Sequence, residues 1–313
     1  FFTNLAFFGR LSFAPAAAAD HHLGLLVLLV PVVGGLVVGV MARYGSPAIR
    51  GHGIPEAMER VLEHESRIPA RLTFLKPLSA AIAIGTGGPF GAEGPIIATG
   101  GALGSLVGQL AHMSPKERRA LLAAGAAAGM AATFGSPVSA VLLAVELLLF
   151  ELSPRSLIPV ALGAVVATAV RFALSGAGAV FPMPEIAAPS ASALATYVVL
   201  GAVVGVASVL LTRAVYGVEA LFERLPIHWM WWPAIGAIVV GVVGFFEPRA
   251  LGVGYDNIER IVSGHFAARA LLFLCVMKLV AWVIALGSGT SGGTLAPLFT
   301  VGGGLGALLG MGV

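Results

Sequence analysis

Five long stretches of mainly apolar residues constrain the fold of this chain more than any other feature. They cover residues 23–42, 120–145, 156–170, 193–212 and 266–277. About 20 apolar residues allow a helix to cross a bilayer, and shorter stretches are typical of partial crossings. Inside a bilayer the backbone must satisfy its own hydrogen bonds, so only helices and closed barrels span it. Because no stretch alternates apolar and polar residues as a barrel strand does, the sequence predicts an all-α, polytopic membrane protein.

These stretches are interrupted by residues that bend or break helices. Pro31 is followed by Gly34 and Gly35, and Gly135 is followed by Pro137. Transport proteins tolerate such breaks where the irregular backbone is buried or faces a water-filled path. We therefore expect tilted and broken transmembrane helices. The net charge of +3 is spread through loops and leaves no basic surface for a nucleic acid.

The same glycine-rich pattern occurs twice in the chain. Residues 85–108, GTGGPFGAEGPIIATGGALGSLVG, align with residues 287–310, GSGTSGGTLAPLFTVGGGLGALLG, at a constant offset of 202. The alignment pairs Pro95 with Pro297 and, further upstream, Lys76 with Lys278. With one residue of slippage, GHGIPEAMERVL also aligns with GVGYDNIERIV. Such regular self-similarity predicts two homologous halves.

The loop at residues 175–192 is rich in proline, glycine and serine and marks the expected boundary between the halves. We assign residues 1–180 to the first half of the membrane domain and residues 181–313 to the second half. The first half continues past its glycine-rich pattern through residues 109–174, whereas the second stops at Val313. The second half is therefore expected to be incomplete at its C-terminus. The pattern leaves open whether the repeat is parallel or inverted.

Three short segments share one design: GHGIP (51–55), GAEGP (91–95) and GTLAP (293–297). Each ends in a proline, which is favoured at the first position of a helix because its missing N–H would have no partner there. The start of a helix offers unpaired N–H groups and the positive end of the helix dipole, and together these bind anions. At mid-membrane they replace part of the hydration shell of an anion and still let it leave.

Glycines in these regions also have a second interpretation, close helix packing. We adopt it for the glycines spaced four residues apart, which are Gly100, Gly104, Gly108, Gly302, Gly306 and Gly310. Packing does not explain Glu93, the lone acid in GAEGPIIATGG (91–101). We therefore interpret the glycines before the prolines as an anion site and Glu93 as a competitor for that site.

In these motifs the chain resembles the CLC family of chloride channels and chloride/proton antiporters, whose signatures are G-S-G-I-P, G-(R/K)-E-G-P and G-x-F-x-P. The three segments occur in the same order over essentially the whole chain. The resemblance implies an inverted-repeat homodimer with one pore per subunit, and a gating glutamate at Glu93. It also implies an integral protein of a prokaryotic inner membrane, with chloride or other small anions and the lipid bilayer as partners. Chloride is then the transported ligand, and no cofactor, metal or enzyme activity is expected.

The chain departs from the family pattern at three positions. His52 replaces a serine that contacts the anion in the family. A neutral imidazole can still donate one N–H, so we interpret His52 as a ligand, with a steric plug or a side chain turned away from the site as the alternatives. Ala92 replaces a basic residue beside the gate, and Leu295 replaces a phenylalanine. The residues predicted to bind the anion are His52, Gly53, Ile54, Glu93, Gly94, Thr294, Leu295 and Ala296.

Antiport needs a separate relay of ionisable groups through the membrane. In the family an inner proton glutamate follows another acid, and the matching stretch here is FGSPVSAVLLAVELLLFE (134–151). It places Glu146 at the first acid and Leu147 at the second, so the inner proton acceptor is absent at its expected position. Glu146 and Glu151 remain as weak candidates. The sequence thus favours a passive, gated chloride channel, with a chloride/proton antiporter or a transporter of fluoride or another anion as the alternative.

Several other residues have simple structural interpretations. The cluster of His228 and the tryptophans before Pro233 is typical of an interfacial aromatic belt. Ser291 in GTSGG matches a short esterase pattern, but no histidine follows His265 and motifs of this length recur by chance. The single cysteine, Cys275, is expected to be a small buried apolar residue. The tyrosines Tyr44, Tyr197, Tyr216 and Tyr255 lie too early in the chain to be the family's central tyrosine.

Overall fold

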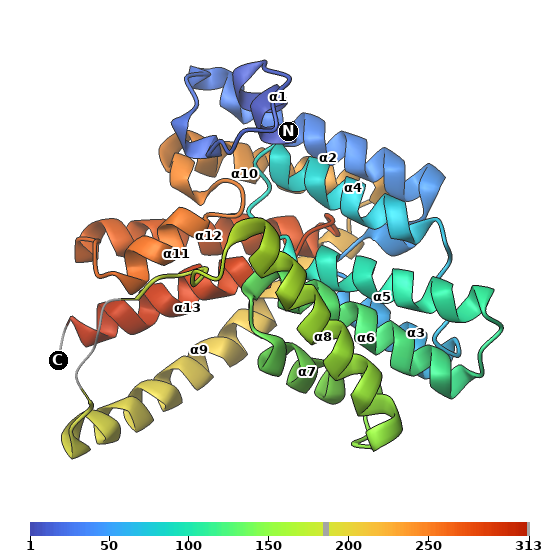
Figure 1. Cartoon of the computed structure of the whole chain (residues 1–313). Coiled ribbons are helices and arrows are strands. Elements are labelled where there is room, and N and C mark those ends of the chain that lie inside the picture. Colours follow the sequence, from blue (N-terminus) through green and yellow to red (C-terminus); the bar gives the residue numbers. More distant parts are fainter. Residues whose placement is uncertain (184–187, 312–313) are drawn as a thin grey trace.

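The computed structural model describes residues 1–183 and 188–311, and its regular structure is almost entirely helical (Figure 1). The helices of the first part are α1 (Phe2–Phe8), α2 (Val30–Val40), α3 (Ile54–Glu63), α4 (Leu72–Gly85), α5 (Glu93–Leu110), α6 (Pro115–Phe134), α7 (Pro137–Ala144) and α8 (Pro154–Ser175). Those of the second part are α9 (Ala191–Glu223), α10 (Trp232–Phe246), α11 (Tyr255–Val262), α12 (Ala268–Gly287) and α13 (Leu295–Gly310). The predicted all-α class is confirmed.

Five helices among the described residues are long and apolar enough to cross a bilayer, judged by length and composition. They are Gly24–Gly45, Pro154–Ser175, Ala191–Glu223, Trp229–Phe246 and Ala268–Gly287. Four of them overlap predicted stretches. The helix Trp229–Phe246 corresponds to none of the predicted stretches, and its tryptophans form the start of a span as well as an aromatic cluster. The predicted stretch 120–145 is not one span: Gly135, at φ 65°, ends α6, and Pro137 starts α7.

Helix irregularities occur near prolines, glycines and closely packed apolar residues. α2 continues as a π-helical turn over Met41–Gly45, and α7 continues as another over Val145–Leu149. Pro77 lies inside α4 and Pro159 inside α8. Tilted and broken helices therefore form this membrane protein, as the sequence predicts.

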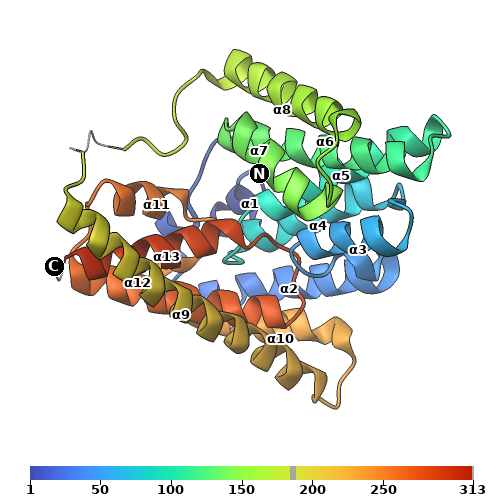
Figure 2. The same cartoon turned by 90° about the horizontal axis from the view of Figure 1, so that it is seen from below.

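The buried apolar residues form two clusters. One joins α3, α5, α6, α7 and α8 and includes Leu122, Leu148 and Val160. The other joins α10, α12 and the N-terminal segment and includes Leu271 and Phe7. Figure 2 shows the α5–α8 group and the α10–α13 group on opposite sides of the region where the first turns of α5 and α13 lie.

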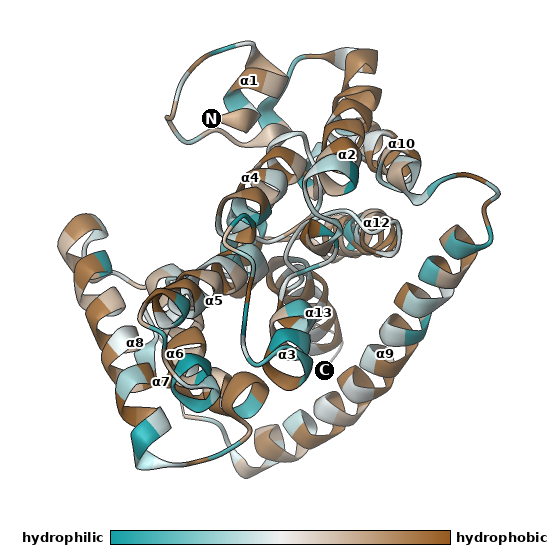
Figure 3. Ribbon diagram, turned by 90° about the vertical axis from the view of Figure 1, so that its right-hand side faces the viewer, coloured by the Kyte–Doolittle hydropathy of each residue, from teal (hydrophilic) through white to brown (hydrophobic). Residues whose placement is uncertain are grey.

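Helix α9 is the least covered element. Its most apolar window is 0% buried, and Phe222 near its C-terminal end is its one fully buried residue. Figure 3 shows α9 running apart from the bundle with apolar residues all along it. It approaches the rest of the chain at its C-terminal part, where Val215 and Val218 pack on the second apolar cluster.

Candidate anion site and gate

The two glycine-rich repeats meet through their backbones. The Gly91 N–H donates to the Gly293 carbonyl at 2.9 Å, and the Gly293 N–H donates to the Gly91 carbonyl at 2.7 Å, an antiparallel pair. A Cβ atom on Gly293 would lie 2.5 Å from the Gly91 carbonyl oxygen, and one on Gly91 would overlap the Glu93 carboxylate. Gly293 therefore requires glycine because the obstacle is backbone, a side chain at Gly91 would displace the Glu93 carboxylate, and the pair places the starts of α5 and α13 side by side.

The segment before α3 joins this contact. The Gly292 N–H donates to the Gly51 carbonyl at 3.3 Å. A Cβ on Gly94 would overlap the His52 carbonyl oxygen and lie 3.2 Å from the Gly293 Cα. Gly53, at φ 95°, turns the chain into α3 where few other residues are tolerated. All three predicted segments thus converge on one region of the structure.

The prolines of these segments lie in the first helical turn, one or two positions later than predicted. Pro55 is the second residue of α3, Pro95 the third of α5 and Pro297 the third of α13. The first four N–H groups of a helix lack an intrahelical acceptor, so proline is tolerated throughout this turn.

Several N–H groups of these first turns are available to a ligand. Within residues 1–183 and 188–311, no atom accepts a hydrogen bond from the N–H of Ile54, Gly94, Leu295 or Ala296. The N–H of Gly53, which the sequence also assigned to the anion, already donates to Glu56 Oε2 at 2.8 Å. The available donors come from both halves of the chain, and the positive ends of three helix dipoles lie near them.

Glu93 is fully buried at the start of α5. Its Oε1 atom accepts a hydrogen bond from the Tyr255 hydroxyl at 2.7 Å. Its Oε2 atom is enclosed and has no hydrogen-bond partner within the described part of the chain. A buried carboxylate normally needs compensating donors, and within the described part of the chain the Tyr255 hydroxyl is the donor that this group receives.

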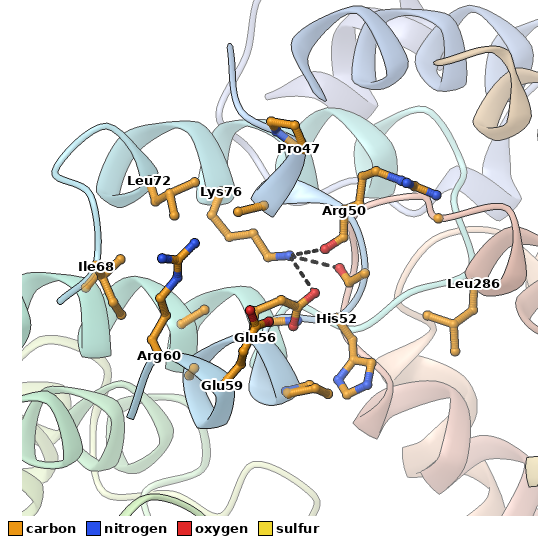
Figure 4. Close-up of a pocket in the computed structure, with 18 of the residues that line it drawn as sticks. Pro47, Arg50, His52, Glu56, Glu59, Arg60, Ile68, Leu72, Lys76 and Leu286 are labelled. Carbon is orange, nitrogen blue, oxygen red and sulfur yellow. Dashed lines mark hydrogen bonds and ion pairs between the residues drawn. The ribbon is translucent and has the colours of Figure 1, made fainter. Parts of the chain in front are cut away.

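His52 lies beside a cavity of about 700 Å³ between α3, α4 and the region of α9 and α12 (Figure 4). Its side chain is half-buried, and its Nδ1 atom is enclosed without a partner in the described structure. Charged side chains of both signs line the cavity; they are Arg50, Glu56, Glu59, Arg60, Lys76 and Glu219. The imidazole therefore lies at a cavity lined by charged side chains, next to the segment that precedes α3.

Two buried lysines hold the loops before α3 and α11. Lys76 Nζ donates to the carbonyls of Ile49, Arg50 and Gly51 at 2.9, 3.1 and 2.9 Å. It also lies 3.9 Å from Glu56 Oε1, and Figure 4 shows it reaching these groups from α4.

Its repeat partner makes the same kind of contact in the second half. Lys278 Nζ donates to the carbonyls of Ala250, Gly252 and Val253 at 3.0, 2.6 and 3.4 Å. The repeat alignment, which pairs the two lysines, thus predicts an equivalent structural role in each half.

The predicted relay positions are not brought to this site. Glu146 is exposed on the π-helical turn after α7, and Leu147 packs against the first apolar cluster. Glu151 is also exposed and accepts a hydrogen bond from the Ser156 hydroxyl at 2.7 Å, at the start of α8. Glu151 therefore contacts a side chain of the first turn of α8 at the surface of the described structure.

Sequence reasoning missed the contact of Tyr255 with Glu93. The tyrosine was considered only as the family's central tyrosine, for which it lies too early. The available signal was the alignment of GHGIP with GVGYD, which pairs Tyr255 with Ile54 at a helix start. Ser291, the weak enzyme candidate, is fully buried and accepts a hydrogen bond from the Ser79 hydroxyl at 3.0 Å.

Comparison with known proteins places this geometry in a family. The family model described as "Voltage gated chloride channel" matches residues 34–313. The chain is 29% identical over 290 residues to the putative chloride channel protein ClcB-like of Ralstonia nicotianae, covering 91% of this chain and 68% of that protein. It is 31% identical over 316 residues to the H(+)/Cl(-) exchange transporter ClcA of Klebsiella pneumoniae, covering 95% of this chain and 65% of that protein.

Solved structures agree with the fold. A slow cyanobacterial Cl-/H+ antiporter superposes with a TM-score of 0.83 at 22% identity, covering 92% of this chain and 68% of the other. A CLC-type fluoride/proton antiporter gives 0.78 at 24% identity, covering 91% and 72%. The chain spans 38% of the length of another relative, chloride channel protein CLC-f of Arabidopsis thaliana. With its family match, its multi-pass helices and its paired glycine motifs, the chain belongs to the voltage gated chloride channel (CLC) family of integral membrane proteins.

Proposed function

We propose that the chain forms the anion-conducting core of a chloride/proton exchanger. The observation that carries the proposal is the buried Glu93 carboxylate at the point where helix starts from both halves converge. Relatives named as H(+)/Cl(-) exchange transporters support exchange. They favour it over the passive channel that the sequence predicts.

The proposed mechanism follows from charge competition in one site. The ionised carboxylate of Glu93 takes the place of an anion near the free N–H groups of Gly94, Leu295 and Ala296. An arriving chloride displaces the carboxylate, which leaves the helix starts and can accept a proton. A neutral carboxylic acid no longer competes with chloride for these donors. Proton uptake by Glu93 and chloride entry are thereby coupled.

A passive chloride channel is the second candidate. It is favoured by Leu147, which stands where the family's inner proton acceptor is expected, and by the exposed positions of Glu146 and Glu151. The Ralstonia relative is named a putative chloride channel protein, which also favours the channel. In this case Glu93 is a gate whose protonation opens the path, without net proton transport.

The two candidates differ in one measurement. The purified protein is reconstituted in vesicles, and a chloride gradient is applied while chloride and pH are recorded together. Exchange predicts uphill proton movement in fixed ratio to chloride, whereas chloride flux without proton movement contradicts it and supports the channel. Glu93→Gln should retain or raise chloride flux and abolish proton movement, because the amide cannot carry the proton. Glu63→Gln, at an exposed carboxylate of α3 outside the site, is the matched control and should leave both fluxes unchanged.

Two further properties are proposed from family membership. We expect a homodimer, with each subunit holding its own site, and location in a prokaryotic inner membrane. Mass measurement of the detergent-solubilised protein tests the first, and membrane fractionation of the host cell tests the second.

A further inference from the structure

We propose that Tyr255 is a latch for the gate, a positioning residue that holds the Glu93 carboxylate in the anion site by a hydrogen bond from its hydroxyl. The proposal rests on the proposed role of Glu93 and adds the residue that sets when the gate is released. The Tyr255 Oη to Glu93 Oε1 distance is 2.7 Å, typical of a strong hydrogen bond to a charged acceptor. It joins the first residue of α11 to the first residue of α5, and so joins the two halves of the chain.

The backbone around Tyr255 is fixed from two sides. Lys278 holds three carbonyls of the loop just before α11. Asn257 Nδ2 donates to the Arg249 carbonyl at 2.8 Å, and Gly254, at φ 77°, turns the chain into the helix. Because these contacts fix the first turn of α11, the Tyr255 hydroxyl is held in one position, where it can bind the Glu93 carboxylate each time that carboxylate returns to the site.

The ring of Tyr255 also has a packing partner. Phe181 lies edge-on to it, with ring centroids 5.8 Å apart. This contact uses the ring and leaves the hydroxyl free to serve Glu93. Removal of the hydroxyl alone therefore separates a latch from a packing role.

The internal repeat shows that the Tyr255 hydroxyl has no counterpart in the first half of the chain. Ile54 occupies the equivalent helix start in the first half, by the alignment of GHGIP with GVGYD. An apolar side chain there cannot donate to a carboxylate, and no acid stands in GTLAP to receive a bond. The acid and its donor are thus present once each, on opposite halves, as a matched pair added to a common scaffold.

The sign of the effect follows from which form of Glu93 the hydroxyl favours. Tyr255 comes from α11, and the other charged or titratable groups facing the site are Lys278 from α12, Lys76 from α4, Glu56 from α3 and His52 before α3. Among them, Tyr255 is the group hydrogen-bonded to the Glu93 carboxylate. A donor to a carboxylate stabilises the ionised form. The latch therefore holds the ionised carboxylate in the anion site and opposes its release.

The experiment uses Tyr255→Phe, which keeps the ring and removes the hydroxyl. Chloride efflux from vesicles is measured from pH 4 to pH 8 for the parent protein, Tyr255→Phe and Glu93→Gln. We expect the pH of half-maximal efflux to rise by about one to two units in Tyr255→Phe, the shift that loss of one hydrogen bond to a charged group produces. Tyr197→Phe, at an exposed tyrosine of α9, is the matched control and should leave the profile unchanged. A Tyr255→Phe profile that superposes on the parent profile overturns the latch.

Two additional results separate the latch from the gate itself. Glu93→Gln should show no pH dependence, and Glu93→Gln with Tyr255→Phe should behave like Glu93→Gln alone. If Glu93→Gln keeps the parent pH profile, the proposed gate fails; if only the Tyr255→Phe shift is missing, the latch alone fails. Infrared difference spectra of the parent protein test the latch without the Tyr255→Phe variant. The carboxyl band lost in Glu93→Gln and a tyrosine band should change at the same pH, and a tyrosine signal that stays constant contradicts the proposal.

Discussion

The contact between α5 and α6 leads to a quantitative prediction about two neighbouring glycines. A Cβ on Gly104 would overlap the Leu121 carbonyl oxygen and lie 2.7 Å from the Leu121 carbonyl carbon and 3.1 Å from the Leu122 Cα. A Cβ on Gly101 would meet Leu122 Cδ2 at 3.5 Å and the Leu122 carbonyl oxygen at 3.6 Å, which is ordinary packing. Alanine at Gly104 must therefore push the two helices apart, whereas alanine at Gly101 need not.

The size of the difference can be worked out from these contacts. Both changes gain the same helix propensity, about 1 kcal/mol, because both glycines lie inside α5. Forcing an extra carbon into a packed interface costs about 1 to 3 kcal/mol, and the upper part of this range applies where the obstacle is backbone that cannot rotate away. We expect Gly104→Ala to be less stable than Gly101→Ala by about 2 to 3 kcal/mol, or roughly 3 to 5 °C in thermal midpoint for a chain of 313 residues.

Thermal unfolding of both variants in the same detergent, followed by tryptophan fluorescence, measures this difference. Gly101→Ala is the matched control, since it lies in the same helix, one turn away, and carries the same chemical change at a buried position. Equal midpoints for the two variants would refute the close backbone approach of α5 and α6.

Two other predictions concern buried and capping charges. Lys278→Met leaves three loop carbonyls without their donor, which should lower the free energy of unfolding by about 2 to 5 kcal/mol. Lys116→Met, at an exposed position of α6, is the control and should change it by less than about 0.5 kcal/mol. Equal losses for the two variants in denaturant titrations would contradict the assigned role of Lys278. Hydrogen bonds from the Ser114 side chain and backbone lower the pKa of Glu117 below 4.5, so their stabilisation is present above that pH and is lost as pH falls through the folded-state pKa. Ser114→Ala should therefore lower the thermal midpoint more at pH 7 than at pH 3, and a larger loss at pH 3 would show that the sign is wrong.

The sequence predicts much of this architecture because the repeat carries three-dimensional information. Pairing GAEGP with GTLAP predicts equivalent helix starts, and the structure brings Gly91 and Gly293 into direct contact. Pairing Lys76 with Lys278 predicts equivalent roles, and both lysines hold the loop before a helix. Local patterns of glycine, proline and apolar residues determine these features, so they can be predicted from a single sequence.

What the sequence did not reveal depends on long-range contacts. The bond of Tyr255 to Glu93 joins residues from opposite halves, and no local spacing marks either residue as the other's partner. The Gly53 N–H was assigned to the anion because its local pattern is right, but the nearby Glu56 carboxylate competes for it. The helix Trp229–Phe246 was overlooked because aromatic residues suit an interface and the first turns of a buried helix equally well.

The mutual bond of Gly91 and Gly293 also bears on how such a site originates and assembles. Each residue donates to the other, which is the reciprocal arrangement of an isologous contact between identical subunits. In a dimer of single halves, this glycine would face its own copy across a two-fold axis, and fusion of the halves would preserve the contact within one chain. Glu93 is then an acidic side chain that the other half lacks, on a backbone arrangement that both halves share. Since its two glycines are 202 positions apart, the contact closes only after residue 293 has been synthesised, so it is absent from a nascent first half.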